Sequence, residues 1–326
     1  MSALAFTIVA VLLVGPVPAL LARATWPMRA PRAAVVLWQA IAVAAVLSAF
    51  SAGIAIASRL LVPGPDGRPT ATIAGEIAQL GWPLWLIYLA VLALTLLIGA
   101  RLVIAVLQVA ITTRRRRAHH RMLVDLLGIS HDSVVARACP PKTQRRRHHW
   151  WPNDLRVLEV AQPLAYCLPG VRSRVVVSKG ALNTLSDTEV TAILTHEFAH
   201  LRARHDLVLE AFTAAHAAFP RLVRSASALD AVRLLIELLA DDAAVRAAGP
   251  TPLARALVAC AAGPTPSGAL AAGGPTTVLR VRRLSGRPNS LTLSVAAYLA
   301  AAAVLVLPTV ALAVPWLTEL HRLFLA

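Results

Sequence analysis

Cysteine is scarce in this chain, which contains only three in 326 residues. Cys139, Cys167 and Cys260 lie far apart, and none has the paired spacing of a zinc knuckle. All three fall in one long segment between apolar runs, which the charge pattern described below assigns to the cytoplasm. The sequence therefore predicts no disulfide framework.

Charged residues are also few, at 15% of the chain, whereas hydrophobic residues make up 57% and the mean hydropathy is +0.66. This composition excludes an ordinary soluble domain, so we expect the chain to contact lipid. Four apolar runs are long enough to cross a bilayer, which takes about 20 residues. They are residues 3–22, 33–57, 82–111 and 291–317, and none repeats another.

The first run lacks a basic segment before it, and its positive charges follow it instead. A secretory signal has the opposite arrangement. We therefore interpret residues 3–22 as an uncleaved membrane span, although Ala22-Arg23-Ala24 resembles a cleavage site.

Acidic residues number only 16 against 32 basic ones, and the positions of the basic residues orient the spans. Arg23, Arg29 and Arg32 lie between the first two spans, and Arg114 to Arg117 follow the third span directly. Short basic loops stay in the cytoplasm. We therefore expect a cell-membrane protein with its N-terminus outside and the long loop 112–289 inside. The basic runs are expected to contact anionic membrane lipids, and no nucleic-acid partner is expected.

Arg101 interrupts the third run. An arginine is costly at mid-membrane but is tolerated near an interface, so we place the inner end of this span near Arg101. The helix is expected to continue through Ile111 toward the basic run. Arg280, Arg282 and Arg283 are interpreted as marking the cytoplasmic edge of the fourth span.

The long loop contains the motif H-E-x-x-H at residues 196–200. Two histidines four residues apart lie on one face of a helix and can bind one Zn²⁺, with the glutamate beside the open position of the metal. We expect His196 and His200 to be zinc ligands and Glu197 to be the general base. Ser186 and Glu189 match a capping box, which predicts that the helix begins there.

A catalytic zinc needs three protein ligands and an open position. Residues 227–249 are predicted to form a second helix, which places Glu237 and Asp241 on one face. We expect Glu237 to be the third ligand of a single Zn²⁺. Asp241 is expected to accept the free N–H of a ligand histidine and thereby fix its tautomer.

The H-E-x-x-H motif followed by E-x-x-x-D on a later helix resembles the gluzincin membrane peptidases of the Ste24/HtpX and BlaR/MecR types. The order of three spans, a zinc domain and a fourth span is most similar to the BlaR/MecR type. This resemblance implies a zinc endopeptidase that cleaves a protein substrate at the cytosolic membrane face, with a transcriptional repressor as one candidate. The best-known members carry an external antibiotic sensor after the fourth span, whereas this sequence stops at Ala326. We therefore do not expect β-lactam sensing, and a separate sensor subunit or a role in quality control stays open.

The resemblance also implies a fold class, namely a mainly α-helical multi-pass membrane protein. We expect three spans within residues 1–111, a cytosolic α+β zinc domain with a small sheet at 112–289, and a fourth span with a short tail at 290–326. Strands are predicted at 155–160, 164–170 and 174–178, and the segment 263–275 is interpreted as a flexible linker.

The resemblance adds two candidate residues for orienting substrate or binding an oxyanion. His205 stands at an offset where some Ste24-type relatives carry a histidine, although we favour the interpretation that it is solvated or lies behind a metal ligand. Tyr166 lies in the strand segment before the zinc helix, which lines the cleft in those families.

A function of another class stays open, namely a non-catalytic membrane scaffold or signal transducer with a structural zinc site. A structural site is normally closed by a fourth protein ligand and has no need of a glutamate in the general-base position. Glu197 therefore favours catalysis. The expected partners are a protein or peptide substrate and membrane lipids, and the sequence is also compatible with a homo-oligomer.

Overall fold

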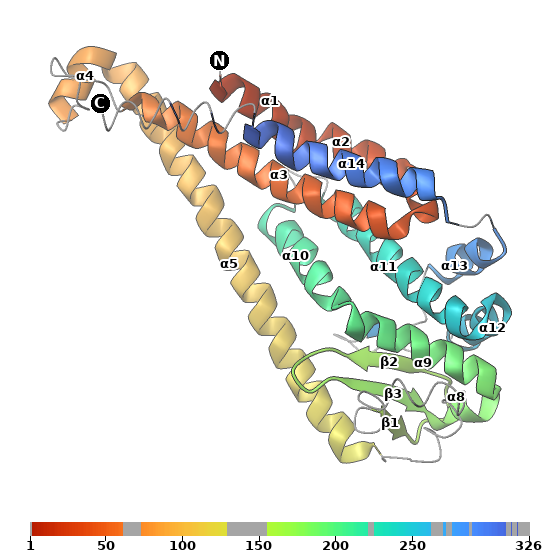
Figure 1. The fold of residues 1–326 in the computed structure, drawn as a ribbon. Helices are drawn as coiled ribbons and strands as arrows, with labels where there is room; N and C mark the ends of the chain where they lie inside the picture. The colour runs from red at the N-terminus through yellow and green to blue at the C-terminus, as the bar shows by residue number, and fades with distance from the viewer. Residues whose placement is uncertain are drawn as a thin grey trace.

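The computed structural model describes residues 2–60, 73–128, 155–220, 225–261, 270–271, 276–286 and 289–310, together with residues 314 and 318. The chain is mainly helical with a small mixed sheet, as predicted (Figure 1). Its helices are α1 (Ser2–Val14), α2 (Pro16–Arg23), η1 (Trp26–Arg29), α3 (Pro31–Ala57), η2 (Ser58–Leu60), α4 (Ile73–Leu80), α5 (Trp82–Leu127), α8 (Lys179–Thr184), α9 (Asp187–Arg202), α10 (His205–Ala218), α11 (Ser225–Ala248), α12 (Pro250–Cys260), α13 (Thr277–Leu284) and α14 (Leu291–Pro308).

Four helical segments are long and apolar enough to cross a membrane, which confirms the predicted number within the described residues. They are residues 3–23, 31–57, 82–127 and 291–308. The first consists of α1 and α2, which meet at Gly15 and Pro16. Helices α1, α2, α3 and α14 lie side by side as one bundle (Figure 1). The predicted end of the fourth span at Leu317 lies outside the described residues.

Helix α5 is 46 residues long and runs without a break from the bundle to the sheet (Figure 1). The prediction that it continues past Arg101 is confirmed, and it extends beyond the predicted boundary at residue 111 to Leu127. The Arg101 guanidinium also has a partner within the protein, because its Nε donates to the carbonyl oxygen of Ala218 at 2.5 Å. Arg101 therefore satisfies one of the free carbonyl groups at the end of α10.

The sheet has the order β1-β3-β2-β4, with β1 (Leu155–Leu158) parallel to β3 (Arg174–Ser178). Strand β2 (Ala165–Leu168) pairs antiparallel with β3 and, at its other edge, with the two-residue strand β4 (Leu270–Ala271). The three predicted strand segments are confirmed. The interpretation of 263–275 as a linker is wrong at β4, which pairs with Tyr166 and Cys167.

Alternate residues of β2 face opposite sides of the sheet. Ala165 and Cys167 lie in the core that the sheet forms with α8, α9 and α12. Tyr166 and Leu168 lie in a separate cluster with Val124 of α5. The sheet is therefore covered by α9 on one side and by the end of α5 on the other.

A further apolar core joins the membrane bundle to α10 and α11. Trp38 of α3, whose side chain is fully buried, packs with Phe212 of α10 and with Val232 and Ile236 of α11. Helix α11, which carries Glu237, thus rests directly on a membrane helix. The site is positioned by the sheet core on one side and by α3 on the other.

Candidate metal centre

Helix α9 begins where the sequence predicts it. The backbone N–H of Ser186 donates to Glu189 Oε2 at 2.9 Å, which completes the capping box. Val190, Ile193 and Leu194 are fully buried and hold one side of the helix in the sheet core. Because the helix is fixed at its start and along this side, its remaining side can present paired histidines at a constant spacing.

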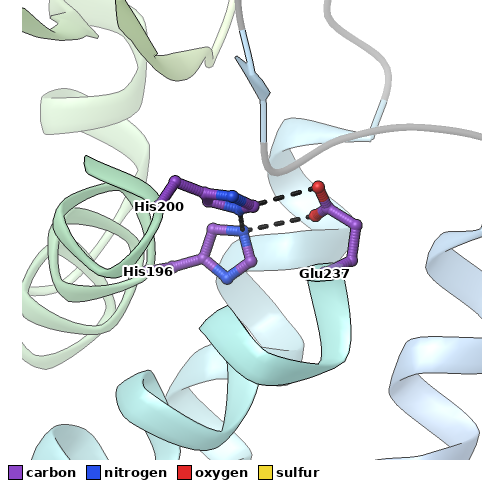
Figure 2. Close-up of side chains that lie close together, drawn as sticks. All are labelled: His196, His200 and Glu237. Carbon is purple, nitrogen blue, oxygen red and sulfur yellow. Dashed lines mark hydrogen bonds and ion pairs between the residues drawn. The ribbon is translucent and has the colours of Figure 1, made fainter. Parts of the chain in front are cut away.

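The structure brings His196, His200 and Glu237 together although they come from two helices (Figure 2). The two Nε2 atoms of the histidines lie 3.2 Å apart. His196 Nε2 is 3.4 Å from Glu237 Oε2, and His200 Nε2 is 3.6 Å from Glu237 Oε1. Neighbouring ligand atoms of a tetrahedral zinc ion lie about 3.3–3.4 Å apart when the bonds are about 2.0–2.1 Å long. The separation of the two histidine nitrogens matches such an ion, and the distances to the two oxygens of Glu237 place this carboxylate within reach of the same ion.

Asp241 lies behind His196, one helical turn from Glu237. Its Oδ1 is 3.0 Å from His196 Nδ1, so the nitrogen that faces away from the other donors has a carboxylate partner. Burial disfavours the charged imidazole, but the hydrogen bonds to Asp241 and Glu237 outweigh it and raise the pKa of His196 to about 9. Asp241 thus occupies the position predicted for a residue that orients a ligand histidine.

Arg280 of α13 belongs to this site, and the sequence analysis missed it. Its Nη1 is 2.9 Å from Glu237 Oε2, its Nη2 donates to Asp241 Oδ1 at 2.6 Å, and its Nε donates to Asp241 Oδ2 at 2.9 Å. Only 1% of Arg280 is exposed, so the interpretation as a marker of the membrane edge is wrong for this residue. No sequence signal could have identified it, because the apolar neighbours Val278 and Leu279 are exposed while the charged residue is buried.

His205 lies at the outer nitrogen of the second ligand histidine. Its Nδ1 is 3.1 Å from His200 Nδ1, and the two rings meet edge to face. Burial lowers the pKa of His200 to about 3 and that of His205 to about 4, so both rings are neutral at physiological pH. Each ligand histidine therefore has a partner behind it, Asp241 for His196 and His205 for His200.

Tyr166 lies on the other face of the sheet, away from Cys167. Its hydroxyl is 3.0 Å from His120 Nε2 of α5, and burial raises its pKa to about 12. The hydroxyl contact is thus with a helix that covers the far face of the sheet, and it does not join Tyr166 to the three donor residues.

Glu197 is fully buried between the sheet and the donor group. Neither carboxylate oxygen accepts a conventional hydrogen bond from the residues that the structure describes. The nearby polar group is the thiol of Cys167, a weak donor whose pKa is raised well above its usual value by burial and by Glu197. Burial and the charge of Glu237 raise the pKa of Glu197 to about 8.

The charges at this centre fit a divalent cation. Glu197, Glu237 and Asp241 face a single guanidinium, that of Arg280, among the described residues. With neutral histidines this arrangement has two negative charges in excess. The raised pKa values of His196 and Glu197 show that protons are drawn to the centre to compensate. Two histidine nitrogens and a carboxylate oxygen are also donors that Zn²⁺ prefers.

Comparison with known proteins agrees with this geometry. Residues 133–288 match the family model described as Peptidase family M48. The matched stretch contains every residue of the centre, including Arg280. No curated protein and no solved structure gives a significant match. Residues 133–288 are therefore similar to peptidase family M48, and the group of His196, His200 and Glu237 is consistent with the metal site of a zinc metallopeptidase.

Proposed function

We propose that this domain is a zinc endopeptidase in which His196, His200 and Glu237 hold one ion and Glu197 is the general base. The observation that carries the proposal is the meeting of three donors within reach of one ion with a buried carboxylate that lacks a conventional partner. A zinc ion bound there would polarise a peptide carbonyl and lower the pKa of a water molecule.

The residues of the chain supply the proton transfers and the orientation. Glu197 takes a proton from the attacking water and delivers it to the leaving amine, since its oxygens are not held by other strong donors. Asp241 accepts the Nδ1–H of His196 and so keeps its Nε2 free for the ion. His205 does the same for His200 from the opposite side.

The contacts of His205 and Tyr166 bear on which residue would bind the oxyanion. The Nδ1 of His205 is turned to the outer nitrogen of His200, which supports a role behind a ligand rather than one in binding the oxyanion. Tyr166 has its hydroxyl at His120. In this proposal His205 acts on a ligand, and an oxyanion role for Tyr166 requires a side-chain position other than the one observed.

The membrane location and the substrate form the second part of the proposal. The four membrane segments and the arginines after the third span support an external N-terminus and a cytoplasmic zinc domain within residues 112–289. The substrate is then a protein cut at the cytosolic membrane face. Regulatory cleavage of a repressor rests on the resemblance to BlaR/MecR-type proteins and on no contact in the structure.

The alternative is a scaffold with a structural zinc site. Such a site would be closed by a fourth protein ligand. Among the described residues the donor group has three members, and the nearby Glu197 is buried without a conventional hydrogen bond. The arrangement therefore favours the enzyme.

Replacement of Glu197 by Gln separates the two functions. We expect Glu197→Gln to keep stoichiometric zinc and to lose proteolysis by a factor on the order of 10²–10⁴, because only the proton transfer is removed. Cleaved membrane and cytosolic proteins would be compared between cells that carry the wild type and the variant, with His196→Ala as the control that loses zinc. Equal cleavage patterns for Glu197→Gln and the wild type would contradict the proposed mechanism.

A further inference from the structure

We propose that Arg117 of α5 is a positioning residue for the metal ligand His200. Arg117 holds Asp206 at the start of α10, and this fixes the neighbouring His205 against the outer nitrogen of His200. The inference rests on the proposed function, because it assumes that His200 binds the ion. It makes the extension of a membrane helix part of the support of the metal centre.

Arg117 differs from the three arginines that precede it. Arg114, Arg115 and Arg116 are exposed, as expected for a basic run beside a membrane, whereas Arg117 is 8% exposed. Its Nη1 is 3.2 Å from Asp206 Oδ2 and 2.6 Å from Glu210 Oε1, two carboxylates on successive turns of α10. The basic run therefore contains one residue with an internal partner.

The contact matters because Asp206 is itself buried, with 2% exposure. Arg204 Nε also lies 3.5 Å from Asp206 Oδ1, but the Arg204 side chain is 56% exposed whereas that of Arg117 is 10% exposed. Arg117 is thus the buried cation of Asp206, and a buried carboxylate that loses such a partner is strongly destabilised. Asp206 is the second residue of α10, and His205 is the first. Fixing Asp206 therefore fixes the direction in which the His205 side chain leaves the helix.

The turn between α9 and α10 makes the contact of Arg117 with Asp206 more important. Helix α9 ends at Arg202 and α10 begins at His205, so only Ala203 and Arg204 connect the two helices. Arg204 in this turn has φ 50° and ψ 43°, a left-handed conformation that is unfavourable for an ordinary residue. Such a turn persists only when its surroundings hold it. The pairs of Arg117 with Asp206 and Glu210 are the charged contacts between α5 and this part of α10 in the described residues.

The last step is the contact between the two histidines. His205 Nδ1 lies 3.1 Å from His200 Nδ1, and the other nitrogen of His200 faces His196 and Glu237. A partner at the outer nitrogen sets the tautomer and the ring orientation of a metal ligand, and its loss typically reduces metal affinity about 10–100-fold. Displacement of His205 should therefore lower the affinity of the chain for the metal ion.

The test uses the purified full chain in detergent, loaded with Co²⁺ in place of zinc, since the visible spectrum of Co²⁺ reports the geometry of its ligands. For Arg117→Gln we expect an altered cobalt spectrum and a loss of Zn²⁺ affinity on the order of tenfold, measured by competition with a chelator. Arg117→Lys should recover much of both, since it keeps the charge. Arg116→Gln, the exposed neighbour with the same loss of charge, should leave both unchanged.

Two further variants distinguish positioning from general packing. Asp206→Asn keeps the pair of Arg117 with Glu210 and should give the same change in the cobalt spectrum as Arg117→Gln. This variant replaces Arg117→Gln in the test if Arg117→Gln does not fold. In a His205→Ala background, Arg117→Gln should have almost no additional effect on Zn²⁺ affinity, because residues that act through one another are not additive.

The outcomes separate the two proposals. A wild-type chain that binds neither Zn²⁺ nor Co²⁺ overturns the proposed function. A wild-type chain that binds both, together with Arg117→Gln and Asp206→Asn variants that bind them with unchanged affinity and spectrum, overturns only the role of Arg117. Fully additive losses in the double variant overturn it as well.

Discussion

Arg280 shows how much of this centre depends on one buried cation. Its guanidinium pairs with both Glu237 and Asp241. Glu237 is a proposed metal donor, and Asp241 is the partner of His196. An arginine can serve both because its planar group donates in several directions at once, whereas a lysine offers one compact charge. Arg280 therefore links Glu237, a proposed metal ligand, to Asp241, the proposed orienting partner of His196.

Replacement of Arg280 by Gln should destabilise the zinc domain. Removal of one partner from a buried ion pair typically costs about 3–5 kcal/mol, because the remaining carboxylates lose their compensation. The loss would be measured by thermal unfolding of the metal-free full chain in detergent. Arg282→Gln, an exposed arginine of the same helix, should have little effect. Full stability of an Arg280→Lys variant would contradict the importance of the planar geometry.

The protonation of the metal-free centre gives a pH-dependent prediction. His196, with a pKa of about 9, and Glu197, with a pKa of about 8, both carry protons at pH 7, while His200, with a pKa of about 3, does not. A metal ligand must be deprotonated, so zinc binding should release between one and two protons at about pH 7. The number should fall as the pH rises through these pKa values. Titration in a weakly buffered solution with a pH indicator would measure it, and release that does not change with pH would contradict the assignment.

The residues of the centre differ in how far a sequence can predict them. His196 and His200 are predictable because a four-residue spacing on one helix guarantees that they are neighbours. Glu237 lies on another helix, so its prediction required the expectation that a catalytic zinc has a third protein ligand. Arg280 acts from a third helix with exposed apolar neighbours, and only the tertiary structure brings it in. Tyr166 faces away because the register of β2 turns Cys167 toward α9.

At the scale of elements, α3 and α5 cross closely near the end of the bundle where α4 lies. A Cβ atom added at Gly53 of α3 would lie 2.0 Å from Oγ1 and 2.8 Å from Cγ2 of Thr95 on α5. Glycine at this position lets the two membrane helices approach each other. Beyond this crossing, α5 leaves the bundle and runs to the sheet (Figure 1).

Gly53→Ala should therefore separate α3 from α5 and lower the thermal stability of the full chain in detergent. Overpacking of this kind typically costs about 1–3 kcal/mol. The double variant Gly53→Ala with Thr95→Gly is the matched control, since it removes the atoms that the new methyl group would meet. We expect it to be more stable than Gly53→Ala alone, and a further loss of stability would show that the crossing is not limited by this contact.

The boundary at residue 111 illustrates what hydropathy can and cannot predict for an element. The apolar composition correctly indicates the start of α5 at Trp82. It gives no end, because the helix continues through a basic segment whose buried member, Arg117, is paired with α10. A domain limit inferred from a change in composition thus falls inside a continuous helix.

For the molecule as a whole, the membrane bundle and the zinc domain share an apolar core. The face of α11 that includes Leu229, Val232 and Ile236 is buried against α3, where Trp38 is 1% exposed. Helix α11 also carries Glu237, so the third donor is placed by a helix that depends on the membrane bundle for its packing. The apolar runs predicted the membrane part and the H-E-x-x-H motif predicted the metal site, but neither pattern reveals that the two parts are packed as one unit.

The segment 112–289 expressed alone should therefore not form a stable water-soluble domain. Without α3, the apolar faces of α10 and α11 would be exposed to water, and contiguous apolar surfaces of this kind lead to association. We expect the fragment to aggregate in aqueous buffer and to bind zinc poorly, as measured by size-exclusion chromatography and metal analysis, whereas the full chain in detergent binds one ion. In the full chain, Trp38→Ala removes the largest side chain of the shared core and should lower stability by about 3–5 kcal/mol. A fragment that is monomeric in water and binds one zinc ion would show that the zinc domain folds independently of the membrane bundle.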